Sequence, residues 1–369
     1  MAYARGLLGH YGETLAFAAV HPIGLYGRLS HKAVLAYLDE LERRWSSQQG
    51  SPRQLSLLAV LPWLIALLPT RKGVGSGGVY IQASPHHLTK AAKVRRILTR
   101  ERARFLCLVH DLIPIDFPEY ARPSGAALHR RRIATVAAMT AETGGAAIAN
   151  SAATGRALQP WLKTGTKIHV ALLGTEALPP AVPLVSDGRP YFVCLGTIEP
   201  RKNHLLLLHM WRHFAETLPP ESVPRLVVVG RRGWENEQIV DMLERCPALV
   251  DHVDELGGCP DAHLSALLRG ATALLMPSFA EGYGMPVAEA LSVGTPVICS
   301  DLPALREVGE DVPEYLDPLD GTGWRAAVLD HAAGGALHAA QMERLPGWHN
   351  PSWEEHIAIV VHAVENLAR

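Results

Sequence analysis

Short apolar runs rich in β-branched residues alternate along this chain with longer stretches of helical periodicity, and this alternation restricts the fold more than any other feature. Strands are expected at Leu15–Val20, Val79–Gln82, Phe105–Val109, Ala146–Ala149, Ile168–Leu172, Tyr191–Leu195, Arg225–Val229, Ala273–Met276 and Pro296–Cys299. Helices are expected at Tyr3–Tyr11, His31–Trp45, His204–Thr217, Glu237–Cys246 and Asp261–Gly270. Buried strands separated by helices predict an α/β protein whose parallel sheets carry helices on both faces.

The segment Pro179–Pro190 divides the pattern in two. It carries four prolines, a Gly and an Asp, a composition typical of a linker. With 369 residues, the chain is long enough for two domains, which we expect at 1–180 and 181–369, with the last helix packing back on the first domain. The first domain opens with a helix that no strand precedes, so we expect either a permuted order or a chain that starts one element late.

The charge is unevenly distributed between these two parts. Residues 1–180 hold 22 Lys+Arg and 10 Asp+Glu, and the remainder holds 13 and 26, so balances of +12 and −13 sum to the net charge of −1. The acidic half argues against a uniform nucleic-acid binder, whereas the basic half suits a domain that faces an anionic partner. The five cysteines form no C-x-x-C pair, which argues against a disulfide framework and favours a reducing, cytoplasmic location.

The longest apolar run extends from Leu55 to Pro69 and contains Pro62. It is shorter than the roughly 20 residues that a membrane span needs. One interpretation is a buried helix or strand pair. The other is an apolar surface that dips into the inner face of a membrane. The basic stretches Lys90–Arg104 and Arg130–Arg132 are either solvated helix faces or contacts with anionic lipid or an acceptor pyrophosphate.

The most informative motif is Pro277–Glu289, which follows a buried strand and leads into a helix that Pro286 can open. Glycines at 282 and 284 allow a ligand to approach the backbone closely. A helix N-terminus after a strand suits phosphate, and carboxylates on either side suit sugar hydroxyls. The alternative is that Glu281 is a loop charge and Glu289 a solvated helix residue.

Two further motifs follow strands of the same half. Leu195–Asn203 places the adjacent cations Arg201 and Lys202 where they could neutralise a diphosphate, or form a solvated basic turn. Val227–Trp234 is a similar strand end. Open α/β sheets bind ligands at the carboxyl ends of their strands, so the three motifs together predict one ligand site.

Two other patterns carry less weight. His209 and His213 are interpreted as ordinary helix residues. Gly73–Gly78 fits G-x-G-x-x-G but precedes a strand, so it is interpreted as a loop.

At this point the sequence resembles the family-4, or group 1, retaining glycosyltransferases, which have the GT-B fold of two Rossmann-like, doubly wound domains facing across a cleft. Glu281 and Glu289 match the family's Glu-x7-Glu signature, and the run EGYGMPVAEALSVGTPVICSDLPALREV continues the likeness. EPRKN at 199–203 matches its cation pair. HDLIP at 110–114 with Pro118-Glu-Tyr120 resembles bacterial polysaccharide and O-antigen mannosyltransferases, and Ala149-Asn150-Ser151 and Leu173-Gly174-Thr175 also match.

The resemblance implies roles position by position. Glu281 would hold the hydroxyls of the donor sugar, Glu289 those of the ribose, and Lys202 with Arg201 the diphosphate. His110 would contact the donor sugar near the reacting carbon. The backbone at Gly282, Tyr283 and Gly284 would cradle sugar and phosphate, and Arg231 and the loop Leu256–Cys259, with Gly257, would lie near ribose or base. Thr197 stands where the family often has Arg. Ser84, His86 and His87 would line the acceptor side.

These roles imply a retaining transferase that uses a nucleotide sugar, with GDP-mannose favoured as donor and a polyprenyl-linked saccharide as acceptor. UDP-glucose is an alternative donor, and a same-fold nucleotide-sugar epimerase or hydrolase and a non-catalytic donor-binding subunit are alternative functions. No Asp-x-Asp occurs in the sequence, so we expect no metal and no other cofactor. The expected partners are the donor, a lipid-linked saccharide and an anionic membrane contacted peripherally, with no nucleic acid.

Overall fold

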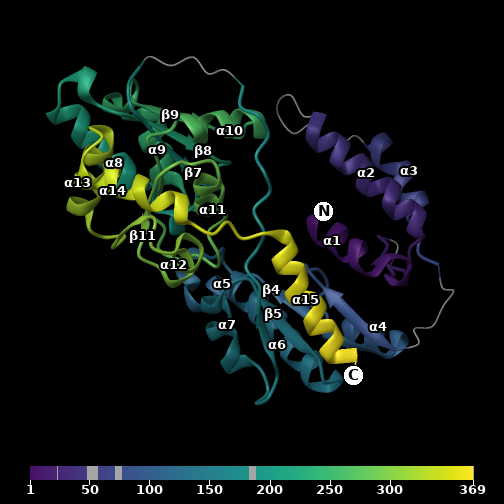
Figure 1. Ribbon diagram of the computed structural model, residues 1–369. Coiled ribbons are helices and arrows are strands. Elements are labelled where there is room, and N and C mark those ends of the chain that lie inside the picture. Colours follow the sequence, from purple (N-terminus) through teal and green to yellow (C-terminus); the bar gives the residue numbers. More distant parts are fainter. Residues whose placement is uncertain (23, 48–56, 71–76, 183–187, 369) are drawn as a thin grey trace.

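A computed structural model describes residues 1–22, 24–47, 57–70, 77–182 and 188–368, and Figure 1 shows that these residues form two α/β parts. The C-terminal part contains a six-stranded parallel sheet in the order β12-β11-β10-β7-β8-β9. The N-terminal part contains a four-stranded parallel sheet in the order β3-β4-β5-β6. The predicted parallel α/β architecture is therefore confirmed.

The strands of the C-terminal sheet are short and almost fully buried at its centre. They are β7 (Tyr191–Leu195), β8 (Arg225–Val229), β9 (Val253–Leu256), β10 (Ala273–Met276), β11 (Val297–Ser300) and β12 (Glu314–Leu316). Alternate residues face opposite sides, as the pleat requires. Phe192 and Cys194 pack with Trp211 of α8 on one side, whereas Val193 packs with Val287 of α11 on the other. Each side of this sheet is thus a separate apolar core.

Helices cover both faces of that sheet. One face is covered by α8 (His204–Thr217), α9 (Glu237–Arg245) and α13 (Gly321–Ala332). The other is covered by α10 (Asp261–Gly270), α11 (Met285–Ser292) and α12 (Pro303–Gly309). The helix α14 (Ala336–Arg344) follows α13, and the buried Gln341 on it donates to the backbone of Val297 and Val312.

The N-terminal sheet is covered by helices from both ends of the chain. Its strands are β3 (Gly78–Gln82), β4 (Ala103–Val109), β5 (Ala146–Ala149) and β6 (Ile168–Val170). One face packs against α4 (Ala91–Glu101), α6 (Gly125–Thr143) and α7 (Ala152–Leu158). The other face packs against α1 (Ala2–Tyr11) and the final helix α15 (Trp353–Ala368), which crosses over from the C-terminal part (Figure 1).

One predicted strand is shortened, and three of the described strands were not predicted, namely Tyr26–Arg28 (β2), β9 and β12. The predicted strand Leu15–Val20 is shortened to β1 (Ala18–Val20), which pairs antiparallel with β2 (Tyr26–Arg28) outside the main sheet. The unpredicted strands β9 and β12 are the two edges of the C-terminal sheet. Edge strands are half exposed and commonly carry charge, and β9 reads V-D-E-L and β12 E-Y-L, so neither shows the apolar run on which the prediction relied.

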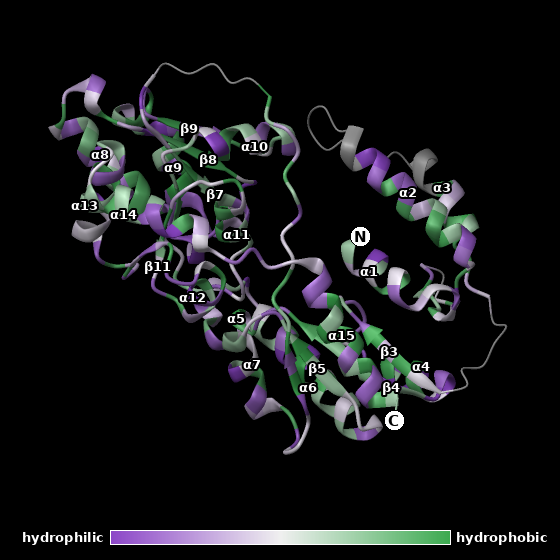
Figure 2. Cartoon of the chain, viewed as in Figure 1, coloured by the Kyte–Doolittle hydropathy of each residue, from purple (hydrophilic) through white to green (hydrophobic). Residues whose placement is uncertain are grey.

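The apolar run Leu55–Pro69 is not the buried element that one interpretation expected. Its first two residues lie outside the described residues, and the next ten form α3 (Leu57–Ala66), which follows α2 (His31–Ser47). Leu61, Ile65 and Leu68 are exposed by 53%, 63% and 44%. Among the described helices, none has the length and apolarity needed to cross a membrane. In contrast to α3, the apolar strands of both sheets lie beneath helices (Figure 2).

The linker prediction concerns residues that the structure describes only in part. Residues 179–182 and 188–190 have no helix or strand, and 183–187 lie outside the described residues. Residues 73–76 of the glycine-rich stretch also lie outside the described residues. Its last two residues, Gly77 and Gly78, have positive φ, and Gly78 begins β3.

Candidate active site

Two neighbouring strands place the main motifs side by side. β10 pairs parallel with β7, with Ala273 opposite Phe192, so both strands end at the same edge of the sheet. The loop Gly196–Lys202 follows β7, and the loop Pro277–Gly284 follows β10. Because neighbouring parallel strands run in the same direction, they bring two loops that are far apart in sequence to the same edge of the sheet.

A buried cluster of charges joins these loops. Lys202 Nζ lies 2.7 Å from Glu281 Oε1, and Arg201 Nη1 lies 3.0 Å from Glu281 Oε2. Arg201 Nε also lies 2.5 Å from Glu199 Oε1. The side chains of Glu281 and Lys202 are only 7% and 9% exposed. The two cations of one motif therefore hold the first carboxylate of the other.

The cluster shifts the ionisation of its carboxylates. Burial by itself would raise the pKa of Glu281, but the charges of Lys202 and Arg201 outweigh burial and lower it. For Glu199 burial prevails over the same cations, and its pKa is raised. Glu281 is thus an ionised acceptor at neutral pH.

Backbone contacts fix the cations in place. Gly196 has a φ of +144°, and a Cβ there would lie 3.3 Å from Cε of Lys202, so the absence of a side chain leaves room for the lysine stem. Phe279 N donates to Arg201 O at 2.8 Å, and Arg201 Nη1 donates to Ala280 O at 3.0 Å. The two loops are therefore tied by backbone as well as by charge.

The second loop ends in the N-terminus of α11. Gly284 is its N-cap residue, with a φ of +115°, and Pro286 lies in its first turn as expected. Gly284 has no side chain to cap the helix, but its carbonyl accepts from Val287 N at 2.9 Å, and Pro286 carries no N–H, so among the first three residues of α11 only Met285 has an N–H that Gly284 O does not hold. Tyr283 is buried, and its hydroxyl donates to Leu173 O at 2.5 Å. This hydrogen bond ties the loop to the segment that follows β6.

Glu289 lies on α11, one turn into the helix. Burial, followed by the nearby charges of Asp261 and Glu176, raises its pKa to about 7. Such a carboxyl exchanges its proton near neutral pH, so it can donate a hydrogen bond when protonated and accept one when ionised. It is not the fully solvated helix residue of the alternative interpretation.

The third motif lies beside the first. Ile198 N donates to Arg231 O, and Gly230 N donates to Leu256 O, which joins the ends of β7, β8 and β9. A Cβ at Gly230 would lie 1.8 Å from the carbonyl oxygen of Gly196, so this crossing requires glycine. The predicted donor-site residues here are exposed, namely Thr197, Arg231 and Gly257.

The N-terminal part meets the Glu281 loop directly. A Cβ on Gly282 would lie 2.5 Å from His110 O and 2.7 Å from Asp111 Cβ, so the two backbones are in close contact. Ser151 Oγ donates to Gly282 O at 2.8 Å, and Thr154 Oγ1 lies 3.2 Å from the same oxygen. His110, at the end of β4, is exposed beside this contact.

The predicted acceptor-side residues follow β3. Gln82 Nε2 donates to Ser84 O at 2.7 Å and lies 3.3 Å from His86 O, which braces the turn. Ser84 is half-buried and His86 exposed, and His87 has a φ of +65°. Burial and then the charges of Lys93, His86 and Lys90 lower the pKa of His87.

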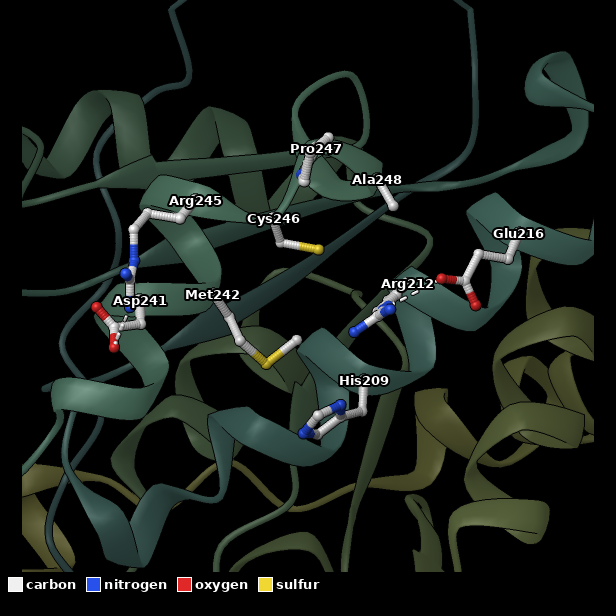
Figure 3. Close-up of a pocket in the computed structure, with 9 residues that line it drawn as sticks. All are labelled: His209, Arg212, Glu216, Asp241, Met242, Arg245, Cys246, Pro247 and Ala248. Carbon is white, nitrogen blue, oxygen red and sulfur yellow. Dashed lines mark hydrogen bonds and ion pairs between the residues drawn. The ribbon is translucent and has the colours of Figure 1, made fainter.

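Figure 3 shows a separate pocket between α8 and α9. Its volume is about 490 Å³, and it is lined by His209, Arg212, Glu216, Asp241, Met242, Arg245, Cys246, Pro247 and Ala248. Arg212 pairs with Glu216 and Arg245 with Asp241, each one turn along the same helix. None of these residues belongs to the cluster at the strand ends, and His209 and His213 are exposed residues of α8.

Several residues between the two parts were not predicted. The ring of Tyr120 stacks on Phe279, and Trp234 Nε1 donates to Tyr120 O at 3.2 Å. Glu307 of α12 accepts from the N–H groups of Ala152 and Ala153 at the start of α7. Tyr120 stands inside the quoted PEY motif, but nothing in the spacing of the sequence shows which residues it would meet.

Comparison with known proteins identifies the C-terminal domain. Residues 180–312 match the family Glycosyl transferases group 1. The chain is 38% identical over 141 residues to O-antigen chain mannosyltransferase B of Escherichia coli, covering 38% of this chain and 36% of that protein. It is 28% identical over 245 residues to the serotype-specific mannosyltransferase WbdA of Escherichia coli, covering 59% of this chain and 28% of that protein. The chain thus spans about a third of the length of these curated relatives.

Solved structures agree on the fold. Sucrose-phosphate synthase from Thermosynechococcus elongatus superimposes with a TM-score of 0.61 at 19% identity, over 79% of this chain and 73% of that one. WaaG, a glycosyltransferase involved in lipopolysaccharide biosynthesis, superimposes with a TM-score of 0.57 at 14% identity, over 73% and 80%. Residues 180–312 therefore form a domain of the glycosyl transferases group 1 family, within a chain that has the GT-B fold.

Proposed function

We propose that this chain is a retaining glycosyltransferase that moves mannose from GDP-mannose to a polyprenyl-linked saccharide in polysaccharide assembly. The observation that carries the proposal is the cluster of Glu281, Lys202 and Arg201 at the edge where β7 and β10 end. An ionised acceptor, two cations and a helix N-terminus lie within one group of loops, and a sugar diphosphate needs all three. The names of the mannosyltransferase relatives support mannose as the sugar.

The geometry suggests how the chemistry would proceed. As the bond from the anomeric carbon to the diphosphate breaks, negative charge grows on the leaving phosphate. Lys202, Arg201 and the positive end of the α11 helix dipole can stabilise that charge without a metal. Glu281, released from part of its pairing, would accept hydrogen bonds from the hydroxyls of the donor sugar. The diphosphate would thus replace a carboxylate as the partner of the cations.

The other groups would complete the donor and acceptor sides. Glu289 would bind the ribose hydroxyls, and Arg231 and Gly257 would lie near the ribose or base. His110 would approach the donor sugar from the facing domain, where Gly282 allows the two backbones to touch. In a retaining transfer the leaving phosphate assists deprotonation of the attacking hydroxyl on the same face of the sugar. Closure of the domains would then exclude water and limit hydrolysis.

Calorimetric titration with GDP, UDP, GDP-mannose and UDP-glucose tests the donor. Preferential binding of GDP and GDP-mannose is expected, and preference for the uridine nucleotides would replace the proposed donor. Incubation with radiolabelled GDP-mannose and a polyprenyl-diphosphate-linked saccharide then tests transfer. Donor breakdown that acceptor does not redirect would favour a hydrolase or epimerase, and donor binding without any turnover would favour a binding subunit.

A further inference from the structure

The segment that follows β4 touches the Glu281 loop at both of its ends. At one end, His110 and Asp111 lie against the backbone of Gly282. At the other end, the ring of Tyr120 stacks on that of Phe279, with centroids 5.6 Å apart and planes only 5° from parallel. Residues 110–120 therefore span residues 279–282 from the facing domain.

The loop between these two contacts carries the charged cluster. Phe279 N donates to Arg201 O, and Ala280 O accepts from the guanidinium of Arg201. Glu281 follows and pairs with both Arg201 and Lys202. A displacement of the Phe279 ring would therefore move the backbone to which Arg201 is bonded and the carboxylate next along the chain.

Tyr120 is itself held from the C-terminal domain. Trp234, which follows β8, donates from Nε1 to Tyr120 O at 3.2 Å. The guanidinium of Arg122 lies 4.8 Å from the centre of the Trp234 ring, at cation–π distance. The backbone of Tyr120 is thus anchored to the C-terminal domain, two residues from the Arg122 contact, which supports the stack of its ring on Phe279.

We propose that Tyr120 is a positioning residue, which acts through Phe279 to set Glu281 and Arg201 against the His110 side of the cleft. The proposal rests on the proposed function for its chemical meaning, because the group positioned is the donor site. Without the ring of Tyr120, the loop 279–282 keeps its contacts with the N-terminal part at Gly282 but loses the contact that holds it at Phe279. Transfer then slows and a larger share of the donor is hydrolysed.

Four variants separate the contribution of the Tyr120 ring from that of its surroundings. Tyr120→Ala removes the stack, whereas Tyr120→Phe keeps the ring and removes only the hydroxyl. Leu337→Ala is the control, because Leu337 on α14 is an apolar side chain that is 39% exposed and lies outside residues 110–122 and 277–284. Phe279→Leu removes the stack from the other domain while keeping an apolar side chain, and it replaces Tyr120→Ala if that variant fails to fold.

Amide hydrogen exchange tests the positioning without any need for turnover. Exchange in residues 277–284 should be about 2- to 10-fold faster in Tyr120→Ala and Phe279→Leu, the range that a lost aromatic pair corresponds to. Tyr120→Phe and Leu337→Ala should match the unaltered protein. The double variant Tyr120→Ala/Phe279→Leu should be no faster than either single variant, since both remove one interaction. Unchanged exchange in this loop, or additive effects, would overturn the proposal.

Steady-state kinetics test the consequence of the positioning by Tyr120 for sugar transfer. With GDP-mannose, kcat for transfer should fall about 10- to 100-fold in Tyr120→Ala and recover in Tyr120→Phe, with the affinity for GDP nearly unchanged. The ratio of hydrolysis to transfer should rise. A fall in GDP affinity with kcat unchanged would show that the ring only supports donor binding and would also overturn the proposal. If the unaltered protein transfers no sugar, the proposed function fails, and the exchange data still decide whether Tyr120 positions the loop.

Discussion

The ammonium of Lys202 lies 2.7 Å from a carboxylate oxygen of Glu281, and both side chains are more than nine-tenths buried. The pair connects the ends of two strands that are neighbours in the sheet but far apart along the chain. This ion pair serves both the fold and the proposed chemistry, because the ammonium that pairs with Glu281 would also bind the diphosphate of the donor.

Replacing Lys202 by Met should abolish most transfer and also destabilise the domain. The change leaves Glu281 buried with Arg201 as its remaining cation, and breaking a buried pair in this way costs about 3 kcal/mol. Loss of a cation at the leaving phosphate should lower kcat/KM by at least about 100-fold. Urea unfolding and transfer assays measure the two effects.

The double variant Lys202→Met/Glu281→Gln provides the control for stability. It removes both charges, so it should be more stable than Lys202→Met alone while transferring no faster. A double variant less stable than the single one would show that the two side chains do not form the interacting pair described here.

Glu289 should make the stability of the protein depend on pH in an unusual direction. Burial, with Asp261 and Glu176, raises the pKa of its carboxyl from the ordinary 4.5 to about 7, so the folded state binds its proton more tightly than the unfolded state. The contribution of this protonated carboxyl to the free energy of unfolding is full below about pH 4.5 and is lost as the pH rises through 7. Its upper limit is about 3 kcal/mol.

Urea unfolding at pH 5 and pH 8 measures this effect. Glu289→Gln should reduce the loss of stability between these pH values, because an amide does not titrate. Glu221→Gln, at an exposed position, serves as the matched control and should leave the loss unchanged. An equal pH dependence in the Glu289 variant and the unaltered protein would contradict the raised pKa.

Adding one methyl group at Gly282 should separate the two domains at the site. A Cβ there would lie 2.5 Å from His110 O, a contact that only a backbone movement can relieve. A misplacement of about 1 Å at reacting groups can cost 100-fold in rate, so Gly282→Ala should lower transfer by about that factor. Gly347→Ala, whose Cβ would meet nothing within 4 Å, should have no such effect, and equal rates in the two variants would refute the close contact.

Donor binding should not depend on a divalent metal. Among the described residues, no three His, Cys, Asp or Glu side chains gather in a way that could hold a metal ion. Arg201 and Lys202 would instead neutralise the diphosphate. Titration of GDP-mannose in the presence of a chelator, and again with added Mg²⁺ or Mn²⁺, should give one affinity, and a tenfold dependence on metal would overturn this prediction.

The central strands of the fold were predictable because buried parallel strands appear in a sequence as short apolar runs. Tyr191–Leu195, Arg225–Val229 and Ala273–Met276 are strands with the predicted bounds. That parallel strands end at one edge was enough to expect Glu281 and Lys202 close together. The edge strands β9 and β12 were not predicted, because charged residues interrupt their apolar pattern.

The contacts between the domains could not be predicted in the same way. Tyr120 and Phe279, or Glu307 and the start of α7, meet only after two sheets have formed and packed. No periodicity or short spacing in the sequence indicates such pairs. Each of these residues fits its own helix or loop equally well whichever residue of the other domain it contacts. The exposed apolar residues of α3 show the same limit, because composition left open whether the run would be buried or form an apolar surface.

The crossing of α15 has a consequence for the order in which the protein is made. This helix follows the C-terminal domain along the chain, yet Ile357, Val360 and Val361 cover one face of the first sheet. While the ribosome is still translating the C-terminal domain, that face of the N-terminal domain has α1 but lacks the part of its cover that α15 supplies. The first domain therefore matures only after the second has emerged, so a chain that stops early exposes an apolar face and is open to quality-control proteolysis.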